Sequence, residues 1–290
     1  MTEGIVPFRE WETWYRISGE IDERPPLVCL HGGPGSTHNY FARLESLVSE
    51  RRAVVVYDQL GCGHSSRPPV GELGLGLFID ELTNLRELLG LERIHLLGTS
   101  WGGMLALEYV LTQPRGLAGL VLSSTLACMS SWANEARRLC DELPEPHRSA
   151  LVAGGSGHAF EEAERAFDRR HVCRLPDAPE IRRMREESSG EVYNALWGPN
   201  EWTPTGTLSG WDVRDRLREI EVPTLITAGR NDLCTAAILE ELQTGLPHSL
   251  TAVFDASSHM PYLEEAPVYA AELSRFLNDL DASEARRAVV

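Results

Sequence analysis

The stretch Ile94–Leu107, IHLLGTSWGGMLAL, contains the turn from which the fold of this chain can be predicted. It opens with an apolar run, Ile94–Leu97, that is typical of a strand buried on both faces. From Trp101 onward the apolar residues recur at the spacing of a helix. Between the two segments lies G-T-S-W-G, which matches the G-x-S-x-G pattern of a sharp turn from strand to helix. The pattern predicts that Ser100 is a nucleophile, because free N–H groups at the start of a helix favour a developing negative charge.

Strand-like runs and helical segments alternate over much of the chain, which indicates an α/β fold with a mostly parallel sheet. The beginning of the chain, over residues 13–30, is expected to form an antiparallel hairpin that leads into the first parallel strand. The predicted strands are Leu27–Leu30, Ala53–Tyr57, Ile94–Leu97, Leu117–Leu122, Thr224–Thr227 and Leu250–Phe254. The predicted helices are Phe78–Leu89, Trp101–Thr112, Ala236–Thr244 and Val268–Leu280.

This alternation stops between about Thr125 and Arg218. The segment is rich in charge, with runs such as EEAERAFDRRH and EIRRMREESSGE, and it has helical periodicity without a clear strand. Ligands of open α/β sheets bind at the carboxyl ends of the strands, so an insertion after Ser123 would cover that edge as a helical cap. We therefore predict a core formed by residues 1–124 and 219–290, with a helical cap over residues 125–218.

Composition excludes several classes of function. The 290 residues carry a formal net charge of -16, so we expect no nucleic-acid partner. We find no signal-peptide pattern and no apolar segment near the roughly 18 residues of a membrane span, so we expect a cytoplasmic protein without a membrane partner. The six cysteines lack metal-like spacing, and we expect them to be reduced. No metal or organic cofactor is expected.

A nucleophilic serine needs a base and a carboxylate that orients the base. His259 follows the last strand-like run and precedes the last helix, and Asp232 follows the strand-like run before it. Both loops therefore leave the sheet at the same edge as Ser100. The order Ser100, Asp232, His259 is the order found in α/β-hydrolases, so we predict these residues as a catalytic triad. Asp255, four residues before His259, is the second choice for the orienting acid.

The third requirement is a pair of donors for the oxyanion of the tetrahedral intermediate. The turn LHGGPG over residues 30–35 follows the first buried strand, and its glycines leave backbone N–H groups unobstructed. We expect the N–H groups of Gly33 and Trp101 to form the oxyanion hole, and His31 to order the turn. An ordinary tight turn is the alternative.

Several motifs together resemble the proline iminopeptidases, a family that includes the tricorn-interacting aminopeptidase and amino-acid amide hydrolases. They are HGGPG (31–35), YDQLGCGHS (57–65), GTSWGG (98–103), GPNEWTPTGT (198–207) and the segments around Asp232 and His259. The resemblance extends from about residue 10 to 280 and includes the predicted cap. It implies an α/β-hydrolase core with a helical cap, the same triad and oxyanion donors, and release of an N-terminal residue from a peptide or amide.

The resemblance also implies an acidic site for the free amino group of the substrate. In these enzymes one acidic residue lies in the cap and another directly follows the triad aspartate. Glu201 matches the cap residue, whereas Leu233 stands where the family has glutamate. Trp197 and Trp202 flank Glu201, and they would line the substrate pocket or pack inside the cap.

Three functions follow from these residues. The first is a serine aminopeptidase or amidase that acts on a small-molecule or short-peptide substrate with a free α-amino group. The second keeps the same machinery for an ester, lactone, thioester or dedicated amide, or for acyl transfer, because Leu233 makes the pocket more apolar. The third is a catalytically silent binding module, against which the intact triad argues. Ser100 excludes the haloalkane dehalogenases and epoxide hydrolases of this fold, because these enzymes need a carboxylate nucleophile.

Overall fold

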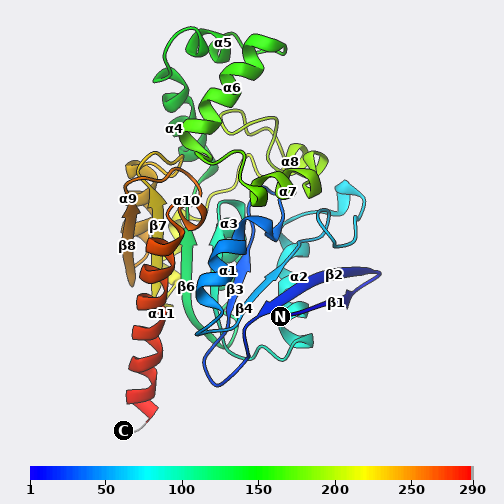
Figure 1. Ribbon diagram of the computed structural model, residues 1–290, viewed down its shortest axis with the longest axis vertical. Helices are drawn as coiled ribbons and strands as arrows, with labels where there is room; N and C mark the ends of the chain where they lie inside the picture. The colour runs from blue at the N-terminus through cyan, green and yellow to red at the C-terminus, as the bar shows by residue number, and fades with distance from the viewer. Residues whose placement is uncertain (289–290) are drawn as a thin grey trace.

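An eight-stranded sheet forms the centre of the computed structural model, which describes residues 1–288 (Figure 1). The strand order is β1-β2-β4-β3-β5-β6-β7-β8, and all pairs from β4 to β8 in this order are parallel. The six predicted strands are confirmed. The strands are β1 Thr2–Phe8, β2 Trp11–Ser18, β3 Leu27–Leu30, β4 Val54–Tyr57, β5 Ile94–Thr99, β6 Leu117–Ser123, β7 Thr224–Gly229 and β8 Ser249–Phe254.

The antiparallel hairpin lies closer to the N-terminus than predicted. It consists of β1 and β2, and β2 then pairs antiparallel with β4 rather than leading directly into β3. The prediction of a hairpin over residues 13–30 was therefore wrong. Only Val6 and Phe8 of β1 are buried, so the strand has little of the apolar alternation by which strands are recognised.

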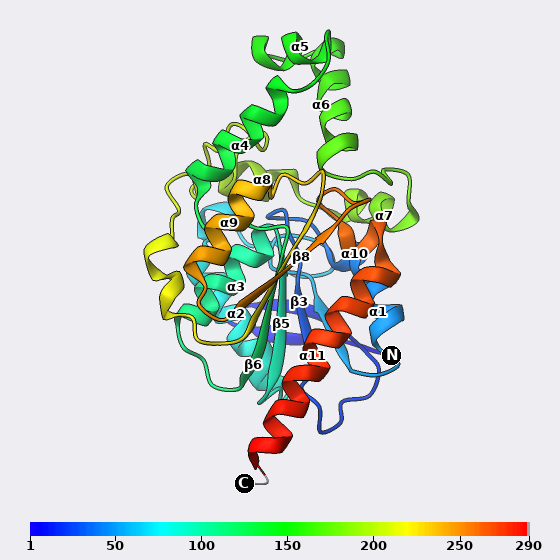
Figure 2. The same ribbon diagram turned by 90° about the vertical axis from the view of Figure 1, so that its left-hand side faces the viewer.

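Helices cover both faces of the sheet, as Figure 2 shows. Neighbouring residues in a strand point to opposite faces, so Val55 and Tyr57 pack on one side while Val54 and Val56 pack on the other. The first face carries α2 (Leu75–Leu88), α3 (Trp101–Leu111) and α9 (Ala236–Gly245). The second face carries α1 (Ala42–Val48) and α11 (Ala266–Ala288), with the short α10 (Pro261–Glu264) above them. The core strands are consequently apolar on both sides.

The segment between β6 and β7, predicted as the cap, contains five α-helices and lies above the sheet (Figure 1). They are α4 (Met129–Asp141), α5 (His147–Ala153), α6 (His158–His171), α7 (Pro179–Glu187) and α8 (Gly190–Leu196). Polar contacts fasten it to the core: Ser189 N donates to Gly35 O over 2.8 Å, and Asn39 Nδ2 donates to Glu187 Oε2 over 2.6 Å. The second contact joins α7 to the segment that follows β3.

None of the helices described between residues 1 and 288 combines the length and the apolar composition needed to cross a membrane.

Candidate active site

The turn between β5 and α3 holds Ser100 in a strained conformation. Its φ of 54° and ψ of -122° lie outside the regions that L-residues normally occupy, at a cost of about 1–3 kcal/mol. The glycines on either side are required by close packing. A Cβ at Gly98 would lie 2.2 Å from Gly102 O, and a Cβ at Gly102 would lie 2.2 Å from Leu30 O. The surrounding backbone thus fixes the turn with Ser100 at the N-terminus of α3.

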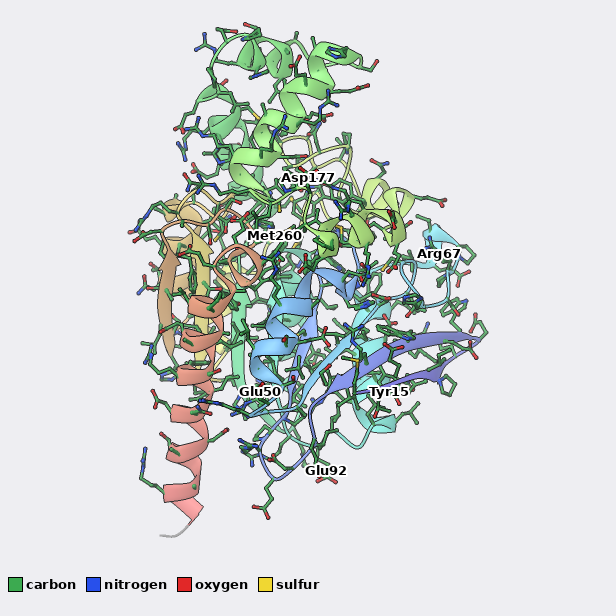
Figure 3. All side chains as sticks on the ribbon, in the orientation of Figure 1. Tyr15, Glu50, Arg67, Glu92, Asp177 and Met260 are labelled. Atoms are coloured by element: carbon green, nitrogen blue, oxygen red, sulfur yellow. The ribbon has the colours of Figure 1, made fainter. Side chains whose placement is uncertain are left out.

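His259 lies on the loop after β8 and is paired with Asp232, on the loop after β7. In Figure 3 the labelled Met260, which follows His259, lies where the core meets the cap. The Nδ1 of His259 is 2.7 Å from Asp232 Oδ1, and the same carboxylate accepts N–H bonds from Cys234 and Gly229 over 2.9 and 3.2 Å. Asp232 thereby holds the imidazole with Nδ1 as donor, which leaves Nε2 as the basic nitrogen.

The charge of Asp232 also sets the basicity of His259. Burial opposes protonation of the imidazole, but the hydrogen bond to Asp232 and the charges of Asp232, Glu201 and Glu264 together outweigh burial, so the pKa of His259 lies above its usual value of 6.5. Asp255, the second choice for the orienting acid, is instead exposed and forms an ion pair with Arg230 at 2.7 Å. The geometry therefore supports Asp232 in preference to Asp255.

The glycine-rich turn after β3 is fixed from several sides. His31 Nδ1 donates to Gly32 O over 2.9 Å and its Nε2 accepts from Gln59 N over 3.0 Å, so His31 orders the turn as predicted. Burial lowers the pKa of His31 to about 4, which keeps the ring neutral. The Tyr40 hydroxyl accepts the N–H of Gly32. Among residues 1–288, no hydrogen-bond acceptor is found for the N–H of Gly33 or of Trp101, and Gly33 lines the cavity beside Ser100 whereas Trp101 is not among its lining residues.

One cavity of about 520 Å³ brings several predicted site residues together. Its lining includes Gly33, Ser100, Glu201 and His259, and it continues over Tyr262. Residues of the core and of the cap both contribute to the wall. Glu201 is the only carboxylate among the described residues that line it. The cavity thus combines a nucleophile, a base and a single acidic group.

Glu201 is held by two donors from the cap. Trp132 Nε1 donates to Oε2 over 3.0 Å, and the Tyr193 hydroxyl donates to Oε1 over 2.8 Å. Burial raises the pKa of Glu201 above its usual value, although both hydrogen bonds and the nearby His259 favour the charged form. A cationic group of a ligand would offset the cost of the buried charge.

Three other predicted substrate contacts do not line this cavity. Trp197 is completely buried and packs edge-to-face against Trp132, with ring centroids 6.1 Å apart. Trp202 packs against Phe167 and lines a neighbouring cavity of about 690 Å³. Leu233 is only 1% exposed and belongs to the apolar core. The structure therefore gives Trp197, Trp202 and Leu233 packing positions and does not place them in the cavity wall beside Ser100.

Several residues around the site were not found from the sequence. Tyr40 and Gln59 hold the glycine-rich turn, and Gln59 also accepts the indole N–H of Trp101 over 2.8 Å. Trp132 and Tyr193 hold Glu201, and they lie 69 and 8 residues from it in the sequence. Neither spacing corresponds to a local motif, so no signal in the sequence identifies these contacts. Among residues 1–288, no group of three or more His, Cys, Asp or Glu side chains is arranged to hold a metal ion.

Comparison with known proteins identifies the family to which this chain is related. A family model described as "alpha/beta hydrolase fold" matches residues 25–145. A proline iminopeptidase from Clostridium botulinum is 42% identical, over 97% of this chain and 99% of its own. The crystal structure of a proline iminopeptidase from Mycobacterium smegmatis superimposes with a TM-score of 0.92 at 36% identity, over 98% of this chain and 100% of its own. The crystal structure of VinJ gives a TM-score of 0.91 at 37% identity, over 96% and 99%.

The sequence identity to curated relatives extends over nearly the whole chain, including the segment between β6 and β7, so more than the common fold is shared. The chain belongs to the proline iminopeptidase family of α/β-hydrolases, and it is a serine hydrolase.

Proposed function

We propose that this enzyme removes an N-terminal residue, proline or a small apolar residue, from peptides or amino-acid amides. The observation that carries the proposal is the cavity in which Ser100 and His259 lie with the buried, hydrogen-bonded carboxylate of Glu201. Ser100, Asp232 and His259 form the catalytic triad, and Glu201 binds the free amino group of the substrate. The names of the curated relatives support proline as a substrate residue.

In the proposed mechanism His259 Nε2 takes the proton of Ser100 as the hydroxyl attacks the substrate carbonyl. The tetrahedral oxyanion is bound by the N–H groups of Gly33 and Trp101. His259 then donates the proton to the leaving amine, the C–N bond breaks, and an acyl-enzyme remains on Ser100. Water, activated by His259, hydrolyses the acyl-enzyme and releases the amino acid.

Glu201 gives this mechanism its specificity. An ion pair with the ammonium would fix the α-carbon of the substrate relative to the wall of the cavity, so that the first carbonyl lies over Ser100. An acylated amine carries no charge and gains nothing from the carboxylate. We therefore expect the enzyme to act at the free N-terminus and not within a chain.

A second candidate is a hydrolase of esters, lactones, thioesters or one dedicated amide, or an acyltransferase. One observation favours it: Glu201 is the only carboxylate in the cavity wall among the described residues, and Leu233 follows the proposed triad aspartate. A single acid binds an ammonium less firmly than two acids do. The same triad chemistry would then serve a neutral substrate.

Initial rates on matched substrates separate the two candidates. Prolyl and alanyl arylamides are compared, each with its α-amino group free or acetylated. Short-chain acyl esters of the corresponding phenol are measured beside them. The proposal predicts that kcat/KM is at least tenfold higher for the free amine. Equal rates for free and acetylated amines, with faster ester cleavage, would favour the second candidate.

A further inference from the structure

Trp132 connects the carboxylate of Glu201 to the imidazole of His259. It lies on α4, the first helix of the cap, and its side chain is completely buried. Its indole N–H donates to Glu201 Oε2 over 3.0 Å. Its ring also packs edge-to-face on His259, with centroids 5.7 Å apart and an angle of 65°. One side chain with two rotatable bonds therefore contacts both the proposed amine site and the proposed base.

Neighbouring aromatic rings restrict Trp132 further. Its ring packs edge-to-face against Trp197 at 6.1 Å, and Trp197 stacks on Tyr193 at 6.4 Å and 22°. The Tyr193 hydroxyl returns to the second oxygen of Glu201 over 2.8 Å. The circuit of Trp132, Trp197, Tyr193 and Glu201 is thus closed by ring contacts and hydrogen bonds. Within this circuit Trp132 is the member that packs on the His259 ring.

Electrostatics place the same two groups within reach of each other. Burial is the largest influence on both, raising the pKa of Glu201 and opposing protonation of His259. In addition, the Glu201 carboxylate raises the pKa of His259, and His259 lowers the pKa of Glu201. A change in the charge of either group therefore shifts the pKa of the other.

We propose that Trp132 is a positioning residue that couples recognition of the substrate amine at Glu201 to the alignment of His259 toward Ser100. The proposal rests on the proposed function, because it assigns the ammonium to Glu201. The indole N–H holds the carboxylate in the cavity wall and favours its charged form. The ring limits rotation of the imidazole about its hydrogen bond to Asp232. Trp132 does not touch the reacting atoms.

Three variants of the full chain separate the two contacts. Trp132→Phe removes the N–H but keeps an aromatic ring against His259, so the ratio of kcat/KM for free over acetylated alanyl arylamide falls about tenfold, mainly through KM, as expected for a lost hydrogen bond to a charged group. Trp132→Leu removes both contacts, so kcat on both substrates also falls, by about tenfold or more, because the base is misplaced. Tyr193→Phe removes the hydrogen bond from the Tyr193 hydroxyl to Glu201 and leaves the contact of Trp132 with His259 in place. Its kcat therefore falls less than that of Trp132→Leu.

Trp211→Phe is the matched control. Trp211 donates its indole N–H to Glu108 over 2.8 Å, a bond of the same kind that involves neither Glu201 nor His259. The control is expected to keep the wild-type ratio and the wild-type kcat. Thermal unfolding of every variant verifies that it is folded.

The outcomes are distinguishable. If wild-type enzyme prefers the free amine and folded Trp132→Phe keeps that preference within twofold, the role of Trp132 is overturned while the proposed function stands. Unchanged kcat in folded Trp132→Leu overturns the alignment of His259 in the same way. If wild-type enzyme shows no preference, the proposed function fails and the coupling fails with it. Should Trp132→Leu not fold, the ratio measured for Trp132→Phe decides the contact with Glu201, and Trp132→Met, which also lacks the ring, decides the contact with His259. A kcat about tenfold lower in folded Trp132→Met supports the alignment of His259, and an unchanged kcat overturns it.

Discussion

Replacement of Glu201 by glutamine tests the proposed amine site with little change of shape. The carboxylate accepts one bond from Trp132 and one from Tyr193. The glutamine carbonyl can accept from Trp132, whose indole only donates, and the amide NH2 can donate to the Tyr193 hydroxyl, which can also accept. Both contacts therefore survive in Glu201→Gln. Since burial raises the pKa of Glu201, the neutral amide also relieves the cost of a buried charge, so the variant should unfold at no lower temperature than wild type.

The substitution removes the attraction for a substrate ammonium, together with the influence of the Glu201 charge on the pKa of His259, and keeps both hydrogen bonds. A hydrogen bond to a charged group contributes about 1.5–3 kcal/mol, which corresponds to about a tenfold to hundredfold change in affinity. We expect kcat/KM on free-amine arylamides to fall by this factor, and kcat/KM on the acetylated substrates to change much less.

The assay is the ratio of kcat/KM for the free and acetylated alanyl arylamides, with Glu108→Gln as control. Glu108 also accepts an indole N–H, from Trp211, but it does not line the cavity. An unchanged ratio in Glu201→Gln, or an equal loss on both substrates, would refute the assignment of the amine to Glu201.

Three further predictions concern the base, the turn and the core. The raised pKa of His259 places the acid limb of kcat/KM for acetylated substrates above pH 6.5, since the protonated imidazole cannot accept a proton, and Glu201→Gln should move this limb to lower pH; a wild-type limb at or below pH 6.5 would contradict the pairing with Asp232. Gly102→Ala should lower the free energy of unfolding by about 1–3 kcal/mol, because its Cβ meets backbone 2.2 Å away, whereas Gly76→Ala, with open space, should not, as measured by urea unfolding. Burial raises the pKa of Glu81 to about 8, so this carboxyl ionises at lower pH in the unfolded chain than in the folded protein, and the free energy of unfolding falls as pH rises from about 4.5 to 8. The free energy of unfolding of Glu81→Gln minus that of wild type, measured in urea, should therefore increase over this range. A difference that does not change with pH would contradict the raised pKa.

The parallel part of the sheet could be predicted from the sequence because its strands are buried on both faces. The run Leu27–Leu30 is completely buried and forms β3 with the predicted bounds. The edge strand β1 could not be predicted in the same way, because most of its residues are exposed and its apolar pattern is weak. A strand that is buried on both faces therefore has a clearer apolar run in the sequence than a strand that is mostly exposed.

The same contrast holds at the candidate site. Ser100, Asp232 and His259 each follow a strand end, so the topology of a parallel sheet predicts their common edge. The contacts of Trp132 depend on how α4 packs on the rest of the cap, and no local spacing encodes that packing. The expectation that Leu233 lines the pocket came from alignment of a motif, and it did not anticipate that the side chain packs into the core.

The most direct test of the account is the mass of the enzyme during turnover. Wild-type protein is mixed with an alanyl aryl ester, quenched in acid within the burst phase, digested and analysed by mass spectrometry. The account predicts an added alanyl group on the peptide that contains Ser100, and neither this adduct nor turnover in Ser100→Ala. An acyl group on another residue, or turnover retained by Ser100→Ala, would contradict the assignment of Ser100 as the nucleophile.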